Sequence, residues 1–306
     1  MSTALVGLDW GTSSLRAYRI DADGAVLERR ESPRGILAVA DGDFEGALRA
    51  LVGDWLRPEL PVLASGMIGS RQGWVEVPYI GCPTDLSTLA GGLATLTLAD
   101  GVSVRFVPGL LTHGDDGIPD VMRGEETQII GACAGAEGDD EVLLVLPGTH
   151  SKWALGRGDA IDWFATFMTG ELFAVLRQHS ILGRLMTTET FDAAAFDRGV
   201  DYGLDRATSR GGLLKRLFSA RTLGLAGDLD GGAVHAYLSG LLLGAEVGEA
   251  LAIRPADSVL VVGSSTLTER YMRALARAGV RAMPGPSDVV ARGQLLVARA
   301  AGMVEI

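Results

Sequence analysis

Two short stretches of this chain combine residue types that bind phosphate. In the first, Asp9 ends an apolar run and is followed by the turn WGTSS. Gly11 allows the backbone to approach a ligand closely, and the hydroxyls of Thr12 and Ser13 add to a row of backbone N–H groups. The Asp9 carboxylate is a hard oxygen ligand suited to Mg²⁺ held mostly through water. These residues predict a phosphate-binding hairpin turn with a metal-binding carboxylate beside it.

The same pattern returns in the stretch LPGTHSKW, where Gly148 and Thr149 align with Gly11 and Thr12. Leu146 stands in the place of Asp9, so only the first copy carries the carboxylate. An ordinary hairpin with a polar turn explains either copy alone, but the repetition indicates a duplicated domain. This second turn is therefore also of the phosphate-binding type, and it contains Lys152, one of the two lysines in the chain.

An acidic cluster lies between the two turns in the sequence. Asp120, Glu125 and Glu126 belong to the segment Asp120–Ala134, whose apolar spacing is partly helical and places both glutamates in the first turn. Acidic residues there stabilise the helix dipole by about 0.3 to 1 kcal/mol each, which is a purely structural reason for them. The functional interpretation is that one carboxylate acts as a general base, and the sequence leaves open which one.

A glycine-rich loop, SGMIGSRQGW, follows a buried strand predicted over Pro61–Ala64. Open α/β sheets bind ligands at the carboxyl ends of their strands. An arginine in such a loop can hold a carboxylate through two parallel hydrogen bonds, although a solvent-exposed connecting loop is the alternative. The candidate substrate-binding residues are Ser65, Gly66, Met67 and Arg71, with Arg123 and Arg34 as further candidates.

A third glycine turn follows the strand predicted over Ser258–Val262. Gly263 and Ser264 lead from it into a helix predicted over Leu267–Ala278. Backbone at such a junction can approach a nucleoside, and a helix N-terminus tolerates anions, although this kind of junction is common in α/β proteins. We predict that Gly263 and Ser264 border an adenosine.

The composition excludes several classes of function. The 306 residues are 47% hydrophobic and carry a net charge of −11, whereas a nucleic-acid or anionic-membrane surface requires a basic patch. Cys82 and Cys133 have no metal or redox spacing, so we expect reduced thiols. No leader pattern begins the chain, and no apolar run approaches the roughly 20 residues that span a bilayer. The sequence therefore predicts a soluble cytoplasmic protein.

The elements that must position these residues follow from apolar periodicity. Besides the two hairpins, a strand is predicted over Val102–Val107, and helices are predicted over Phe44–Leu56, Ala233–Ala252 and Asp288–Ala300. The polar segment Glu137–Glu141 is the predicted hinge. It divides the chain into an N-terminal domain, residues 1–137, and a C-terminal domain, residues 138–306.

The order of the Asp9 hairpin, the Lys152 hairpin and the Gly263 turn resembles the phosphate-one, phosphate-two and adenosine motifs of the actin, sugar-kinase and Hsp70 superfamily. More closely, six segments resemble the 2-dehydro-3-deoxygalactonokinase family over essentially the whole chain. They are LDWGTSSLRAY, SGMIGSRQGW, DVMRGEETQ, LPGTHSKW, FMTGELF and VVGSS.

This resemblance implies an α/β fold of two ribonuclease-H-like, actin-like ATPase domains with a nucleotide cleft between them. It implies that the protein binds ATP and Mg²⁺ and phosphorylates the C6 hydroxyl of 2-dehydro-3-deoxy-D-galactonate in galactonate catabolism. It also implies that the second turn binds the phosphates through Gly148, Thr149, His150 and Ser151, with Lys152 neutralising charge. The expected partners are the sugar acid and ATP, without nucleic acid or membrane, and a homodimer is the assembly considered. Two alternatives remain open: a kinase or phosphatase of this fold for another small molecule, and a non-catalytic nucleotide-binding assembly or sensor module.

Overall fold

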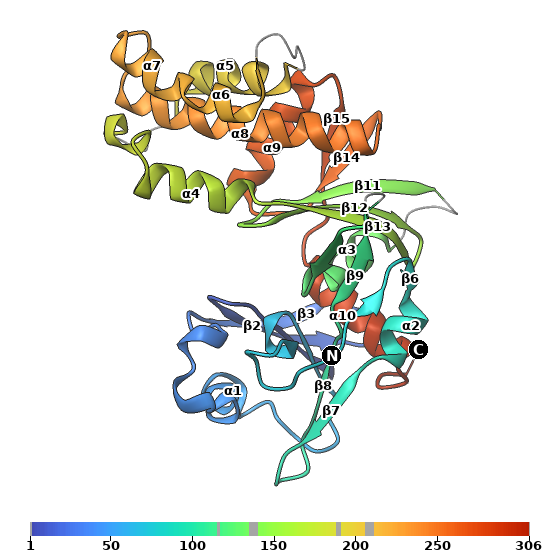
Figure 1. Ribbon diagram of the computed structural model, residues 1–306. Coiled ribbons are helices and arrows are strands. Elements are labelled where there is room, and N and C mark those ends of the chain that lie inside the picture. The colour runs from blue at the N-terminus through green and yellow to red at the C-terminus, as the bar shows by residue number, and fades with distance from the viewer. Residues whose placement is uncertain (1, 115–116, 135–139, 188–190, 206–210, 306) are drawn as a thin grey trace. The chain divides into compact units, whose positions relative to one another are not determined.

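The computed structural model describes residues 2–114, 117–134, 140–187, 191–205 and 211–305 (Figure 1). Within it the chain forms two compact units that are not continuous in sequence. Unit 1 comprises Met1–Val142, Ala154–Phe164 and Pro286–Ile306, and unit 2 comprises Leu143–Trp153 and Ala165–Gly285. The boundary predicted between residues 137 and 138 lies outside the described residues, and the division into domains there stays a prediction.

The central sheet of unit 1 contains the predicted first hairpin. Its strand order is β3-β2-β1-β4-β8-β7, with β1 antiparallel to β2 and parallel to β4. The strands are β1 (Thr3–Trp10), β2 (Leu15–Asp21), β3 (Val26–Ser32), β4 (Val62–Ser65), β7 (Ala94–Thr97) and β8 (Ser103–Phe106). Because β1 and β4 are parallel, Asp9 and Ser65 lie opposite each other where both strands end.

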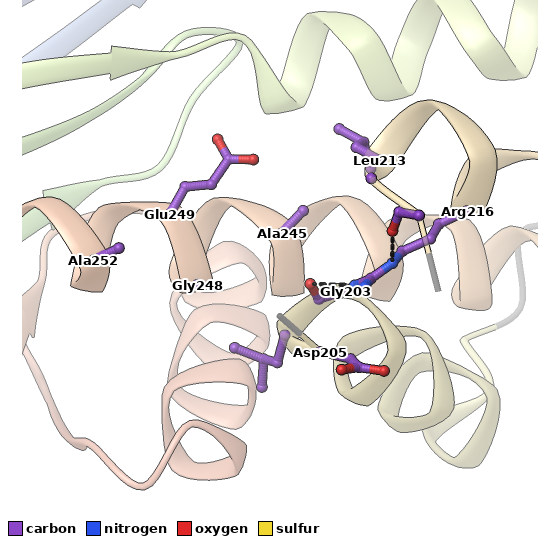
Figure 2. Close-up of a pocket in the computed structure, with 11 residues that line it drawn as sticks. Gly203, Asp205, Leu213, Arg216, Ala245, Gly248, Glu249 and Ala252 are labelled. Atoms are coloured by element: carbon purple, nitrogen blue, oxygen red, sulfur yellow. Dashed lines mark hydrogen bonds between the residues drawn. The ribbon is translucent and has the colours of Figure 1, made fainter. Parts of the chain in front are cut away.

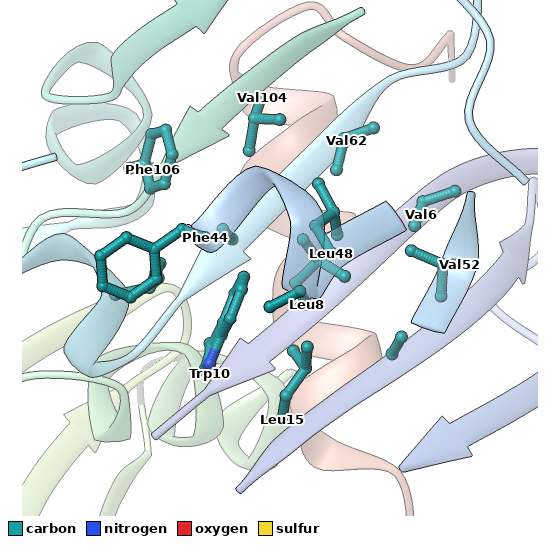
Figure 3. Close-up of a cluster of buried hydrophobic side chains, with 14 of the residues drawn as sticks. Val6, Leu8, Trp10, Leu15, Phe44, Leu48, Val52, Val62, Val104 and Phe106 are labelled. Atoms are coloured by element: carbon teal, nitrogen blue, oxygen red, sulfur yellow. The ribbon is translucent and has the colours of Figure 1, made fainter. Parts of the chain in front are cut away.

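Helix α1 (Phe44–Val52) and this sheet both contribute apolar side chains to one hydrophobic core (Figure 3). Trp10 of β1 lies edge-on to Phe44, their ring centroids 5.7 Å apart, and Phe44 in turn stacks on Trp74. The helix begins where the Asp43 side chain accepts a hydrogen bond from the backbone of Gly46. It ends four residues before the predicted Leu56, because the segment after Val52 continues as a series of hydrogen-bonded turns.

A small sheet, β10-β9-β5, precedes the helix that carries the acidic cluster. Its strands are β5 (Ile80–Gly81), β9 (Leu110–His113) and β10 (Pro119–Met122), and two short elements, β6 (Thr84–Asp85) and α2 (Leu86–Gly91), lie between β5 and β7 in the chain. Helix α3 spans Glu125–Cys133, so both glutamates occupy its first turn as predicted. The helical pattern was wrong for Val121, which pairs with Leu111 of β9 in the strand that ends before the helix.

Helix α10 (Val289–Ala300) packs against α3 within unit 1, although the sequence division placed it in the C-terminal domain. Glycines make this crossing very close. A Cβ atom added at Gly293 would overlap the carbonyl oxygen of Thr127, and one added at Gly131 would overlap that of Val289. The position of a helix in the sequence does not predict which unit it joins, because that depends on which apolar surface the helix covers.

The sheet that contains the second hairpin has the strand order β15-β14-β11-β12-β13-β6. Its strands are β11 (Glu141–Leu146), β12 (Ser151–Arg157), β13 (Ala160–Phe167), β14 (Ser258–Val261) and β15 (Arg281–Pro284). Counted along the chain, β11 to β15 repeat the order of β1, β2, β3, β4 and β8, with β14 parallel to both β11 and β15. This repeated topology agrees with the duplication that the two similar turns indicated.

The helices of unit 2 pack around α8, whose Gly240 and Gly244 face α5 so closely that an added Cβ would overlap backbone of Phe196 and Val200. They are α4 (Thr169–His179), α5 (Ala193–Leu204), α6 (Leu213–Leu217), α7 (Ser219–Leu225), α8 (Gly231–Ile253) and α9 (Ser265–Arg277). By length and composition α8 could cross a membrane, contrary to the expectation from the sequence, but 67% of its apolar window is buried inside the protein, as in a core helix.

Candidate active site

Asp9 lies at the carboxyl end of β1, where its side chain is 17% exposed. Its Oδ2 is 3.4 Å from Nη1 of Arg16 on β2. Burial has the largest effect on the pKa of Asp9 and raises it. The Arg16 charge lowers this pKa, whereas the Glu125 carboxylate raises it. A mostly buried carboxylate whose pKa is raised by a second carboxylate favours binding of a divalent cation, which would offset both charges.

The turn after Asp9 is held in place by a second segment of unit 1. Gly11 donates a backbone hydrogen bond to Ser14, and its carbonyl accepts one from Ile36 at 3.0 Å. A Cβ atom at Gly35 would overlap the Thr12 backbone, so the close approach of the two segments requires glycine there. Thr12 and Ser13 are exposed, as phosphate ligands must be before binding.

The loop after β4 begins with a serine that faces inward. Ser65 is 1% exposed, and its hydroxyl lies 3.4 Å from the Leu8 carbonyl and accepts a hydrogen bond from Nε2 of Gln294 at 2.9 Å. Met67 is half-buried and packs on the core. The Ser65 hydroxyl therefore organises the strand ends, and its predicted contact with substrate stays a prediction.

Two glycines bring the Ser65 loop against the start of α3. Gly66 has φ +93° and Gly124 has φ +108°, conformations that other residues rarely adopt. A Cβ added at Gly124 would lie 3.1 Å from the Cα of Gly66. The backbones therefore pass side by side, and Glu125 follows directly after this contact.

The structure distinguishes the two glutamates that the sequence left equivalent. Glu126 is fully buried; its Oε2 accepts a hydrogen bond from the backbone of Gly124 at 2.6 Å, and its Oε1 has no partner among the described residues. Burial, assisted by the Glu125 charge, raises the pKa of Glu126 to about 8, so this side chain is mostly a neutral acid at pH 7. Glu125 is only half-buried, and its carboxylate acts electrostatically on Asp9.

Asp120, the third member of the predicted cluster, lies on β10 rather than on α3. Its Oδ1 accepts a hydrogen bond from the next backbone N–H, that of Val121, at 2.7 Å. It is opposite Thr112 in the small sheet. The sequence grouped Asp120 with Glu125 and Glu126, but it belongs to a different element.

Two of the three predicted arginines, Arg71 and Arg123, have opposite environments, and the third, Arg34, is exposed. The Arg71 side chain is 87% exposed and pairs with Glu76 at 3.3 Å. Arg123 is 8% exposed; its Nη2 donates to the Val77 carbonyl at 2.7 Å, and its guanidinium lies 4.5 Å from the centre of the Tyr79 ring. Its Nε and Nη1 are buried without hydrogen-bond partners among the described residues. Of the two arginines, only Arg123 keeps a buried charge with unused donors.

In unit 2 the second phosphate-type turn rests on a buried carboxylate that sequence reasoning missed. Glu246 of α8 accepts hydrogen bonds from Trp153 Nε1 at 2.8 Å, from Tyr271 at 2.9 Å and from Ser151 at 3.3 Å. Burial raises the pKa of Glu246. The Ser151 hydroxyl thus points into the fold, while Lys152, 4% exposed, donates to the carbonyl of His150 at 3.2 Å. The lone acid in the apolar segment LLLGAEVG was the available signal for Glu246.

The start of α4 lies against the same turn. Glu171 donates its backbone N–H to the Thr149 carbonyl at 2.9 Å, and its carboxylate is paired with His150 Nε2. A Cβ atom at Gly170 would overlap the Gly148 carbonyl, so only glycine allows this approach.

A cavity of about 80 Å³ lies directly beside the second turn. Its wall is mainly apolar and includes Gly148, Phe173, Leu243, Leu267 and Arg270. Gly263 and Ser264, the predicted adenosine-binding residues, are exposed at the start of α9, the helix that contributes Leu267 and Arg270. These features place the cavity, the second turn and the third glycine turn in one region of unit 2.

A larger pocket of about 320 Å³ lies elsewhere in unit 2, beside α5, α6 and α8 (Figure 2). There Arg216 donates to the carbonyls of Gly211 and Gly203, and Glu249 of α8 stands at the wall. None of the residues predicted for the site lines this pocket. In the part of the chain that the structure describes, no three His, Cys, Asp or Glu side chains gather into a metal cluster.

Comparison with known proteins identifies the group to which this chain is related. A family model described as 2-keto-3-deoxy-galactonokinase matches residues 9–297. A curated relative from Rhizobium meliloti (strain 1021), named "Probable 2-dehydro-3-deoxygalactonokinase DgoK1", is 38% identical over 97% of this chain and 98% of its own. The 2-dehydro-3-deoxygalactonokinase of Escherichia coli (strain K12) is 35% identical over 91% of each chain.

The structural comparison agrees. The crystal structure of a Sinorhizobium meliloti protein assigned to the 2-dehydro-3-deoxygalactonokinases has a TM-score of 0.86 and 38% identity, covering 97% of this chain and 98% of that one. The fold is the α/β fold of the actin-like ATPases and sugar kinases, as the resemblance of the six segments implied. The chain belongs to the 2-keto-3-deoxy-galactonokinase family.

Proposed function

We propose that this protein is an ATP-dependent kinase that phosphorylates the C6 hydroxyl of 2-dehydro-3-deoxy-D-galactonate in galactonate catabolism, and that it acts in the cytoplasm. The observation that carries the chemistry is the mostly buried Asp9 carboxylate at the end of β1, whose pKa is raised by the charge of Glu125 at the start of α3. Family membership over nearly the whole chain supports the sugar acid as substrate.

We assign the general-base role to Glu125. A base for a sugar hydroxyl must be ionised and accessible. Glu125 is half-buried, whereas Glu126 is fully buried and has a pKa of about 8. Glu125 would accept the proton of the C6 hydroxyl as the hydroxyl oxygen attacks the terminal phosphorus of ATP, and the bond from that phosphorus to the bridging oxygen would break to release ADP.

We assign Asp9 to the magnesium ion, whose charge would neutralise the phosphates during transfer. The mostly buried carboxylate and the nearby Glu125 charge fit a divalent cation. The turn Gly11–Ser13 offers exposed hydroxyls and backbone N–H groups for phosphate. In unit 2, the turn Gly148–Lys152 is the second proposed phosphate-binding turn, and Glu246 and Tyr271 hold its Ser151 hydroxyl in place.

The adenosine would bind beside the cavity of about 80 Å³. Its apolar wall suits the faces of an adenine ring, and Gly263 with Ser264 lies at the start of the helix that forms part of that wall.

For the carboxylate of the sugar acid we propose Arg123. Its Nε and Nη1 are buried without partners among the residues that the structure describes, and an unpaired buried donor is costly unless a ligand satisfies it. Tyr79 and the Val77 carbonyl fix the guanidinium from its other sides.

The first test is a coupled ADP-release assay with MgATP and a panel of sugar acids. The panel includes the galactonate- and gluconate-derived 2-oxo-3-deoxy acids, and the assay is repeated with Asp9→Ala. Turnover of the galactonate-derived acid that collapses in Asp9→Ala supports the proposal. Absence of turnover with every acid, while ATP still binds, would instead favour a non-catalytic nucleotide-binding module.

A further inference from the structure

One glutamine of the last helix reaches both strand ends that carry the proposed site. Gln294 of α10 is fully buried. Its Nε2 donates to the Leu8 carbonyl at 2.8 Å and to the Ser65 hydroxyl at 2.9 Å. These partners precede it by 286 and 229 residues in the chain, so the contact depends entirely on the tertiary structure.

The two hydrogen bonds lie where the parallel ladder between β1 and β4 ends. Asp9 pairs with Ser65 as the final register position of these strands. After Ser65 the backbone turns away at Gly66, whose φ is +93°. The Gln294 amide therefore bonds the carbonyl just before Asp9 and the side chain opposite Asp9, beyond which no further rung of this ladder holds the strands together.

The neighbouring residue connects the same helix turn to the base. Gly293 lies so close to α3 that a Cβ atom there would overlap the Thr127 carbonyl. Thr127 is in the first turn of α3, two residues after Glu125. Two consecutive residues of α10 thus contact the ends of β1 and β4 and the start of α3.

Fold stability alone does not account for the amide. Within the described part of the chain, Gln294 Oε1 is buried without a partner, and a Cβ atom at Gly7 would overlap it. An unpaired buried oxygen destabilises the fold, and an apolar side chain of similar length would avoid that cost. The two hydrogen bonds that Nε2 donates therefore explain the amide better, because they hold the Leu8 carbonyl and the Ser65 hydroxyl in place.

We propose that Gln294 is a positioning residue that fixes Asp9 and the Ser65–Gly66 loop relative to Glu125. This inference rests on the kinase function proposed above. Gln294 itself does not touch substrate; it acts through the Leu8 carbonyl and the Ser65 hydroxyl.

The test compares Gln294→Met, which keeps side-chain length but removes the donors, with Arg292→Met, an exposed control on the same helix. We expect Gln294→Met to lower kcat about 10- to 100-fold, because small misplacements of reacting groups have effects of this size. The Mg²⁺ concentration for half-maximal rate should rise several-fold, the KM for ATP should stay within about twofold, and the control should match the wild type.

A double variant separates positioning from general damage. If Gln294 acts through Ser65, the kcat of Gln294→Met with Ser65→Ala should fall no further than that of the more impaired single variant. Two outcomes would overturn the proposal. One is a double variant whose loss of kcat equals the product of the two single losses. The other is a Gln294→Met enzyme that has a lowered melting temperature but wild-type kcat and Mg²⁺ dependence.

A binding measurement keeps this test separate from that of the kinase function. If the wild type phosphorylates no sugar acid, Mn²⁺ binding in the presence of ADP is followed by electron paramagnetic resonance for the wild type, Asp9→Asn and Gln294→Met. Weakening by several-fold in both variants supports the positioning role although the kinase proposal has failed. Wild-type Mn²⁺ affinity in Gln294→Met overturns it.

Discussion

At the residue scale, burial separates two adjacent acids that share one helical turn. Glu125→Gln should lower kcat by about 10² to 10⁴, the range usual for loss of a general base. Glu126→Gln should lower it less than about tenfold, because Glu126 is buried and mostly neutral at pH 7. Steady-state kinetics of both variants with the sugar acid and MgATP check this. The reverse ranking would transfer the base role to Glu126.

Glu126 also predicts how stability depends on pH. Its folded pKa of about 8 exceeds the ordinary value of 4.5, so between these pH values the folded protein holds a proton that the unfolded chain has released. The free energy of unfolding should therefore fall by about 1 kcal/mol for each pH unit raised within this window. Urea unfolding at pH 5, 6, 7 and 8 measures it, and Glu126→Gln should flatten the slope. An equal slope in that variant would show that other groups cause it.

The two arginines offer a matched comparison of substrate binding. Arg123→Met should raise the KM for the sugar acid about 10- to 100-fold, the effect of losing hydrogen bonds from a charged group. Arg71→Met should change this KM less than about threefold, since the Arg71 side chain is 87% exposed and pairs with Glu76. Substrate saturation curves at fixed MgATP measure the KM for the sugar acid in both variants. Similar changes in both would remove the special role of Arg123, and retained ATP affinity is the control for folding.

At the element scale, the contact of α10 with α3 depends on glycine. Gly293→Ala adds a methyl group where the Thr127 carbonyl lies, and overpacking of this kind costs about 1 to 3 kcal/mol. Urea unfolding should show that loss, accompanied by a lower kcat because Thr127 belongs to the turn that carries Glu125. Gly91→Ala is the control, because its added methyl meets no heavy atom of the described residues within 4 Å. Wild-type stability of Gly293→Ala would show that the two helices readily separate.

At the scale of the whole molecule, the last segment of the chain belongs to unit 1 together with the first. Deletion of residues 286–306 removes α10 and its contacts with α3 and β1, so the amides of β1 and α3 should lose their protection from hydrogen exchange. Amides of α8 and α5 in unit 2 should keep theirs. Deletion of residues 302–306 alone, beyond the end of α10, is the control. Uniform loss across both units would mean that they fold as one.

The sequence by itself determined the local elements and the family. An apolar strand, a glycine–hydroxyl turn and a returning strand are encoded by neighbouring residues, so the hairpins at Asp9 and at Gly148 and the helices after Glu125 and Gly231 were predictable. The six family segments are likewise local, and the comparisons confirmed the family that they indicated.

Only the tertiary structure decided which of these side chains remain available for chemistry. The burial of Glu126 and Arg123, the inward direction of Ser65 and Ser151, and the exposure of Arg71 depend on elements far apart in the chain. Gln294 illustrates the reason, because its partners at Leu8 and Ser65 come within hydrogen-bond distance only after α10 has packed against the first sheet. Periodicity reports which face of an element is apolar, whereas the packing of distant elements determines the pKa and the free donors of each polar group.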